Sequence, residues 1–182
     1  HVAGAVGCMM AVVMGVDPAD NDTLDRACDL GLAFQLANIA RDLVADAGVG
    51  RCYIPADWLT GLALAEGDIA EPPNRAALAA IAARLAGLAR DYRASALVGA
   101  ARLSPRSRLA VLAAEAIYGA IGERVVSLGP RAWDQRVRIG KAGKYRLLAG
   151  AMLRSATSPV PASRTGLWTR PRQSAGSLAP RS

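Results

Sequence analysis

The apolar positions of this 182-residue sequence recur with a helical period over long stretches, and Gly and Pro residues separate these stretches. Asp, Asn, Ser and Pro stand where helices would begin, which is typical of N-terminal caps. The predicted long helices run from about residue 20 to 47, from 72 to about 97, from 104 to near 129, and over 140–154, with a short helix after Pro55. No stretch alternates apolar and polar residues at period two, so the sequence predicts an all-α protein with little or no sheet.

The opening run, HVAGAVGCMMAVVMGV, is apolar for 15 residues after His1. It is shorter than the roughly 20 residues of a membrane span, and it lacks the basic residues and A-x-A pattern of a signal peptide. Small residues at Ala3, Gly4 and Gly7 would let another backbone approach closely. A buried core helix is therefore the preferred interpretation, with a membrane segment as the alternative. Since the sequence starts at His1 rather than Met, we expect it to be an internal part of a longer protein.

A thin polar strip interrupts the apolar surface of the helix predicted over residues 20–47. Gln35, Asn38, Asp42 and Asp46 follow one another at steps of three and four, so they share one side of the helix. The residues that border the strip or lie opposite to it are apolar, namely Leu32, Leu36, Ile39, Leu43, Ala33, Ala37, Ala40 and Val44. A helix that is apolar nearly all round is typically buried, and a buried carboxylate needs a cation. Arg41 lies off the strip and could serve one acid only.

Two interpretations of the strip remain open. Two acids at i and i+4 are usually the solvated face of an amphipathic helix. Alternatively, Asp42 and Asp46 could place oxygens on a shared Mg²⁺, which keeps several waters and takes its other ligands from substrate phosphates. Gln35 and Asn38 could hold those waters or the phosphate oxygens. This second interpretation predicts a phosphate-bearing substrate in an apolar cavity.

Composition excludes several other kinds of site. The three cysteines form no C-x-x-C pair and the only histidine is His1, which argues against a zinc cluster and a Ser-His-Asp or Cys-His site. Free thiols fit a reducing compartment, so we expect a cytoplasmic protein. Residues 130–182 carry eleven of the 22 basic side chains and one acid. We expect residues 156–182 to be a disordered basic tail, a solvated spacer more readily than a contact to RNA or an anionic membrane.

Three stretches resemble the squalene and phytoene synthase family, most closely its bacterial phytoene synthases. They are HVAGAVG, LGLAFQLANIARDLVADAGVGRCYIPADWL and RAWDQRVRIGKAGKYRLL, so the resemblance covers about residues 1–154. It implies an all-α isoprenoid synthase bundle over residues 1–155, here incomplete at its N-terminus. It also implies a prenyltransferase that joins two geranylgeranyl diphosphates head to head, through a cyclopropylcarbinyl diphosphate, to give phytoene for carotenoid biosynthesis. Mg²⁺, or alternatively Mn²⁺, would assist loss of diphosphate.

The resemblance also implies roles for individual residues. Asp42 and Asp46 match the second aspartate-rich motif and would be catalytic metal ligands. The residues that would contact diphosphate or shape its pocket are Gln35, Asn38, Arg41, Arg51, Tyr53, Lys141 and Lys144. Ala45 stands where the family commonly has an acid, and the first aspartate-rich motif with its tyrosine is missing from the chain. We therefore expect the chain alone to be inactive.

Other functions stay open at this stage. A squalene or dehydrosqualene synthase is the nearest alternative, although the chain has no G-x-G-x-x-G that would suggest a nicotinamide site. A non-catalytic helical module that docks on a partner is the alternative from another class. The expected partner is a prenyl diphosphate, with peripheral contact at the inner face of a membrane as an addition. No nucleic acid is expected, and the sequence does not fix the oligomeric state.

Overall fold

The computed structural model describes residues 2–171. These residues form α-helices and short 3-10 helices, and no strand occurs among them. The elements are α1 (Val2–Val13), α2 (Asn21–Ala47), α3 (Ala56–Thr60), η1 (Glu66–Asp68), η2 (Pro72–Asn74), α4 (Arg75–Ala100), α5 (Pro105–Leu128), η3 (Gly129–Trp133) and α6 (Lys141–Ser155). The prediction of an all-α protein is confirmed, and the long helices begin and end near the predicted residues.

Local signals explain where the long helices begin and end. The Asp20 carboxylate accepts a hydrogen bond from the Thr23 backbone N–H at 3.0 Å and caps the start of α2. Ser104 caps α5 in the same way, and Pro105 occupies the first turn, where its missing N–H is not needed. Gly129 ends α5 with a φ of 55°, a left-handed conformation that favours glycine.

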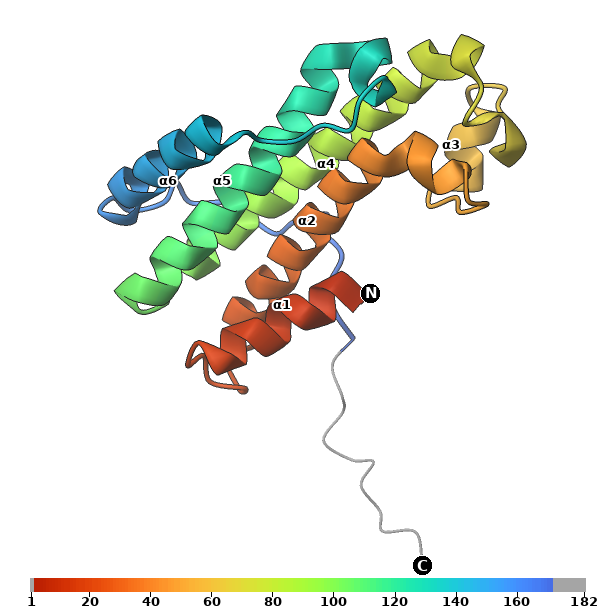
Figure 1. Ribbon diagram of the computed structural model, residues 1–182. Coiled ribbons are helices and arrows are strands. Elements are labelled where there is room, and N and C mark those ends of the chain that lie inside the picture. Colours follow the sequence, from red (N-terminus) through yellow and green to blue (C-terminus); the bar gives the residue numbers. More distant parts are fainter. Residues whose placement is uncertain (1, 172–182) are drawn as a thin grey trace, which may run out of the picture.

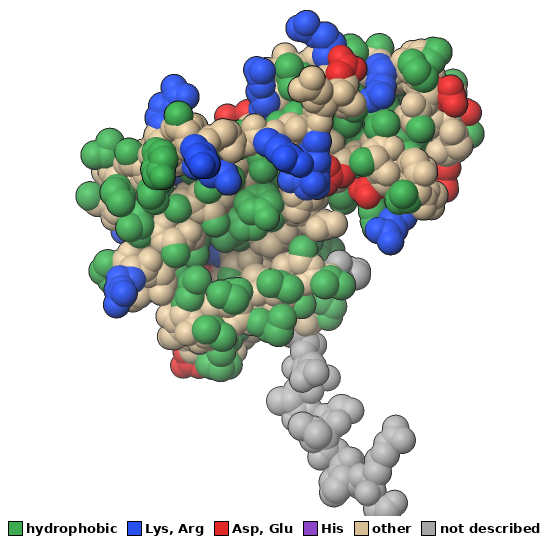
Figure 2. All heavy atoms as spheres, in the orientation of Figure 1, with side chains coloured by type: hydrophobic (Ala, Val, Ile, Leu, Met, Phe, Trp, Pro, Cys, Tyr) green, Lys and Arg blue, Asp and Glu red, His purple; other side chains and the backbone are tan. Residues whose placement is uncertain are grey.

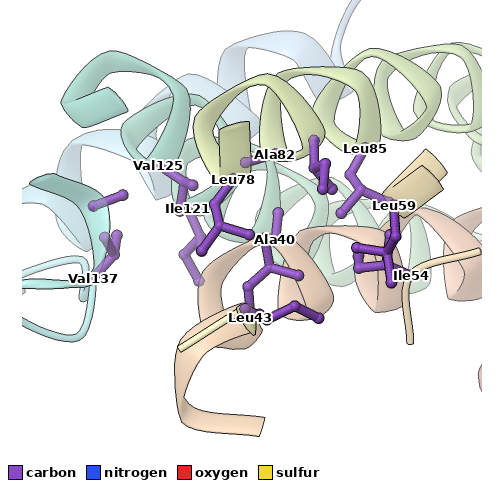
Figure 3. Close-up of a cluster of buried hydrophobic side chains, with 13 residues drawn as sticks. Ala40, Leu43, Ile54, Leu59, Leu78, Ala82, Leu85, Ile121, Val125 and Val137 are labelled. Atoms are coloured by element: carbon purple, nitrogen blue, oxygen red, sulfur yellow. The ribbon is translucent and has the colours of Figure 1, made fainter. Parts of the chain in front are cut away.

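The core lies among α2, α4 and α5, which run side by side in Figure 1. Buried apolar side chains from all three helices meet there, including Leu43, Leu78 and Val125, and Figure 3 shows this cluster. The face of α2 that enters the core carries Ala33, Ala37 and Ala40. The polar strip lies on the other side and is partly exposed, so the expectation that α2 is buried nearly all round is wrong for the described residues.

Helix α1 packs across α2 through small residues. A Cβ atom placed on Gly7 would overlap the carbonyl of Ala27, and one on Gly31 would overlap the carbonyl of Ala3. The predicted close backbone approach is therefore confirmed. However, the predicted burial of this helix is wrong for the described chain, because Val2, Val13 and other apolar residues face outward, with 80% of Val2 and 78% of Val13 exposed. Only Gly4 and Ala11 are buried.

Residues 156–171 form no helix, but they make specific contacts with the bundle. Arg164 binds Asp29, whose carboxylate accepts hydrogen bonds at 2.7 and 2.9 Å. Arg170 lies 2.8 Å from Asp25, and the Ala162 carbonyl accepts a hydrogen bond from Arg26. The predicted boundary of a disordered tail at residue 156 does not match these contacts. The rest of the predicted tail, residues 172–182, lies outside the described residues.

None of the described helices combines the length and the apolar character that a membrane crossing needs. Helix α1, which forms within the apolar opening run, is 12 residues long.

Candidate functional site

The candidate site is centred on Asp42, near the end of α2. Arg41 and Arg136 both bind this carboxylate through two nitrogens each. The Arg136 Nε and Nη2 atoms lie 3.1 Å from Oδ1 and Oδ2 of Asp42, and Arg41 Nε lies 2.9 Å from Oδ1. The Asp42 side chain is 15% exposed, whereas that of Arg136 is 57% exposed. Two guanidinium groups thus neutralise a largely shielded carboxylate. Arg41 is the sequence neighbour of Asp42, and Arg136 is 94 residues away in the sequence.

The two arginines keep Asp42 ionised. Burial by itself raises the pKa of this carboxyl group, but hydrogen bonds and charge from Arg41 and Arg136 outweigh it and lower the pKa to about 2. The hydrogen bonds to Asp42, and more weakly the charge of Asp46, raise the pKa of Arg136. Arg136 therefore binds Asp42 directly and lies close enough to Asp46 to be influenced by its charge.

Arg136 was not among the residues predicted from the sequence. It lies between η3 and α6, and two neighbours fix this stretch against the core. The Trp133 Nε1–H donates a hydrogen bond to the Ala40 carbonyl at 3.2 Å, and Val137 is buried in the main hydrophobic cluster. One signal could have found it, because a shielded acid needs more cation than Arg41 alone supplies and the basic residues concentrate after residue 130.

An apolar cavity of about 430 Å³ opens beside the strip. Its walls come from α1, α2, α4 and α5 and consist mainly of Ala, Gly, Val, Leu and Met side chains. Gln35 and Asn38 are among its few polar lining residues, and Phe34 supports the wall by stacking on Tyr118 at 4.1 Å between ring centroids. Since Asn38 and Asp42 are one helical turn apart, about 6 Å along the axis, the strip leads from the cavity towards the charged site.

The other predicted residues differ in how closely the structure connects them to Asp42 and Asp46. Arg51 follows the strip directly, because its backbone N–H donates to the Asp46 carbonyl at 2.9 Å, and its side chain is exposed. Tyr53 is 51% exposed. Lys141 and Lys144 are exposed in the first turn of α6, and within the described residues the structure does not join either lysine to the strip by a hydrogen bond or ion pair.

The donor set of this site suits a metal that takes most of its ligands from elsewhere. No group of three or more His, Cys, Asp or Glu side chains among the described residues could enclose a metal ion. Asp42 and Asp46 offer two carboxylates, and Mg²⁺ commonly binds through one or two carboxylates together with phosphate oxygens and water. The pair therefore fits Mg²⁺ that arrives with a phosphorylated ligand, and it does not fit an all-protein metal cage.

Comparison with known proteins places this chain in a family. The family model described as squalene/phytoene synthase matches residues 1–142. A 15-cis-phytoene synthase of Enterobacter agglomerans is 50% identical over 174 residues, which are 94% of this chain and 58% of the relative. A phytoene synthase of Pseudescherichia vulneris is 47% identical over 94% of this chain and 56% of the relative. A bifunctional lycopene cyclase/phytoene synthase of Phycomyces blakesleeanus is 41% identical over 66% of this chain and 22% of the relative.

The chain belongs to the squalene/phytoene synthase family, and its all-α structure agrees with the isoprenoid synthase fold that the resemblance implies. It spans a little more than half the length of the two bacterial relatives named above, with 58% of one and 56% of the other covered.

Proposed function

We propose that this chain forms part of a phytoene synthase, a prenyltransferase that condenses two geranylgeranyl diphosphates head to head. The reaction passes through a cyclopropylcarbinyl diphosphate and gives phytoene, two diphosphates and two protons. Because these products balance the substrates, the reaction consumes no reductant. The proposal draws support from relatives named phytoene synthases that are 47–50% identical to the chain.

The observation that carries the proposal is the polar strip of α2. It leads from an apolar cavity to the Asp42 carboxylate, which Arg41 and Arg136 both bind. Gln35 and Asn38 lie in the cavity wall, and Asp42 lies one turn beyond Asn38. A prenyl diphosphate has the same two parts, an apolar chain and a charged head. The cavity walls would hold the chain and keep water away from a carbocation, while the charged end of the strip would bind the head.

Asp42 and Asp46 would hold Mg²⁺, or Mn²⁺ in its place, at the diphosphate. The metal would supply positive charge that stabilises the leaving diphosphate. Arg41 and Arg136 are the nearest cations of the chain itself, and we propose that they contact the diphosphate oxygens once the head group binds. Arg51 would add positive charge at the edge of the site, as would Lys141 and Lys144 in the first turn of α6, and Tyr53 would shape the pocket.

The alternative functions have less support. A squalene or dehydrosqualene synthase would use the same kind of cavity, but the similar relatives named above carry the name phytoene synthase. A docking module has no need for a shielded carboxylate bound by two arginines at the end of a cavity. For location, the three cysteines are free thiols in the structure, which fits the proposed cytoplasmic setting.

The test is a product analysis of the complete protein that contains this chain. We expect purified protein with Mg²⁺ to convert geranylgeranyl diphosphate into phytoene and diphosphate, identified by chromatography against standards. Farnesyl diphosphate with a reduced nicotinamide serves as the matched control and should give little C30 product. A C30 hydrocarbon as the main product would show a squalene-type enzyme, and substrate binding without turnover would favour a non-catalytic role.

A further inference from the structure

The two arginines that bind Asp42 occupy the carboxylate positions that a metal ion would use. Oδ1 of Asp42 accepts hydrogen bonds from Nε of Arg41 and Nε of Arg136, and Oδ2 accepts them from the Nη2 atoms of the same two residues. A carboxylate offers about four lone-pair positions, so these four hydrogen bonds use all of them. A metal ion that coordinates either oxygen therefore has to replace one of the two guanidinium groups.

Arg136 is the partner that can leave Asp42. Its side chain is 57% exposed, whereas the Arg41 side chain is 15% exposed. In Figure 2, Lys and Arg side chains gather next to Asp and Glu side chains over the part of the molecule where Figure 1 draws the end of α2 and the chain that leads to α6. The Arg136 guanidinium can therefore turn from Asp42 towards solvent, or towards an anion that binds at this surface, without the movement of a helix.

The stretch that carries Arg136 is held in place by other contacts. Before Arg136 in the sequence, the Trp133 Nε1–H donates a hydrogen bond to the Ala40 carbonyl, and after it Val137 is buried in the main hydrophobic cluster. These two contacts anchor the backbone on both sides of Arg136. The ion pair with Asp42 is therefore not needed to fix the loop, and the side chain can exchange partners while the backbone stays where it is.

The cost of breaking the ion pair depends on what Arg136 binds next. A metal ion alone offers the released guanidinium no new anion, so the two charge-assisted hydrogen bonds to Asp42 are lost. A diphosphate offers oxygens that a guanidinium binds in the same two-pronged geometry, so the lost bonds are replaced. In addition, the two acids and the two arginines of the site cancel one another in charge, so the site with Arg136 in place attracts a free cation only weakly.

We propose that Arg136 is a displaceable counterion that keeps Asp42 from binding a metal ion until a diphosphate is present. This inference rests on the proposed function, because it takes a prenyl diphosphate as the ligand. The Arg136 guanidinium moves to the oxygens of the bound diphosphate, and an Asp42 oxygen then becomes available to Mg²⁺. Metal ion and diphosphate therefore bind with positive coupling, and each raises the affinity for the other by the same factor.

Binding of Mn²⁺ to the complete protein tests the proposal without a measurement of turnover. Electron paramagnetic resonance detects free Mn²⁺, so a titration gives the Kd of the metal ion in the absence of any diphosphate. We expect Arg136→Gln to bind Mn²⁺ about tenfold more tightly than the unchanged protein, because Asp42 loses one competing guanidinium. Asp42→Asn, introduced into both proteins, identifies the part of the signal that comes from metal ions bound elsewhere.

Arg138→Gln is the matched control, because it removes an exposed charge from the same loop two residues away. It should change the Kd of Mn²⁺ by less than about twofold, since salt screens exposed charges that do not touch the carboxylate. Circular dichroism should show the same helix content in all variants. An equal gain in affinity for Arg138→Gln and Arg136→Gln would assign the effect to net charge and overturn the proposal.

The coupling itself is measured with geranylgeranyl thiodiphosphate, an analogue that ionises slowly. Saturating Mn²⁺ should tighten its binding to the unchanged protein about tenfold or more, and this gain should be about fivefold smaller in Arg136→Gln. Equal Mn²⁺ affinity of Arg136→Gln and the unchanged protein, in a protein that still makes phytoene, would overturn the counterion role and leave the proposed function in place. A protein that makes no phytoene and binds neither Mn²⁺ nor the analogue would refute both.

Discussion

Helix α2 carries two pairs of aspartates with the same spacing, and their surroundings differ. Asp25 and Asp29 lie near its start and are 2% and 0% exposed. Arg164 and Arg170 from residues 156–171 bind them, and Ser95 donates a hydrogen bond to Asp29 from α4. Asp42 and Asp46 lie near the other end of α2 and both are partly exposed, and Arg136 binds Asp42 from a loop.

The difference separates a structural pair from a pair that can bind a ligand. The charges of Asp25 and Asp29 are balanced by groups that are themselves largely shielded, because the Arg164 and Arg170 side chains are 14% and 23% exposed. Asp42 instead shares a guanidinium that is more than half exposed and can turn towards an incoming phosphate. The i, i+4 spacing is therefore insufficient to identify a metal site, and the exposure of the partner cation is the more informative property.

Asp29→Ala should have the largest effect. Removing this carboxylate leaves the Arg164 guanidinium shielded without its main partner, which costs about 3–5 kcal/mol of unfolding free energy. Urea unfolding followed by circular dichroism measures the change. Asp57→Ala, at an exposed position of α3, is the control and should change the free energy by less than about 0.5 kcal/mol. A decrease in the unfolding free energy below about 1 kcal/mol for Asp29→Ala would mean that Asp25 and Asp29 are not a structural pair.

Asp42→Asn should destabilise the fold less than Asp29→Ala, by about 1–2 kcal/mol because both Arg41 and Arg136 lose a charged partner, and should have a large effect on activity. The amide keeps the shape of the side chain but loses a metal-binding charge, so we expect phytoene formation by the complete protein to fall by about 100-fold or more. This corresponds to about 2.7 kcal/mol of activation free energy. Unfolding and turnover are measured on the same preparation. Activity near that of the unchanged protein would remove Asp42 from the proposed site.

Arg136→Gln should lower the unfolding free energy by about 1 kcal/mol at neutral pH, because Asp42 loses one of its two charged partners. The pKa of Asp42 is lowered to about 2 from an ordinary value of 3.8. The folded state therefore gains stability from this carboxylate above pH 4, and loses it as the pH falls from about 4 to 2.

The Arg136→Gln variant should show a weaker decrease of stability across that range and a higher Asp42 pKa. Urea unfolding as a function of pH measures the first, and carboxyl carbon chemical shifts measure the second. Arg124→Gln, on the exposed side of α5, is the control. An unchanged Asp42 pKa would show that Arg136 does not hold the carboxylate in solution.

Lys144→Gln should have the smallest effect. An exposed lysine at the edge of the site contributes little, so we expect KM for the prenyl diphosphate to rise by about threefold with kcat unchanged. The unfolding free energy should change by less than about 0.5 kcal/mol. Steady-state kinetics of the complete protein provide the measurement. An unchanged KM would assign Lys144 to the solvated face of α6 and restrict the diphosphate contacts to α2 and Arg136.

Much of the fold and part of the candidate site could be predicted from local sequence patterns. Helix starts at Asp20 and Ser104 depend on capping by neighbouring residues, and the strip from Gln35 to Asp46 depends on the helical repeat alone. Asp25 and Asp29 have the same repeat, but no local pattern distinguished them from a solvated face. Their burial results from contacts with remote residues, such as Ser95, 66 positions from Asp29, and Arg164, 135 positions from it.

The sequence by itself determined the helices, their order and the common side of the strip residues, because caps, prolines and the 3.6-residue repeat act within a few residues of each other. Only the tertiary structure decided which acids are buried, that Arg136 meets Asp42, and that a cavity lies beside Gln35 and Asn38. These properties arise from the packing of α2 against α1, α4 and α5 and from the path of the chain after η3. Burial and ion pairing depend on all groups that surround a side chain, and most of these groups are remote in the sequence.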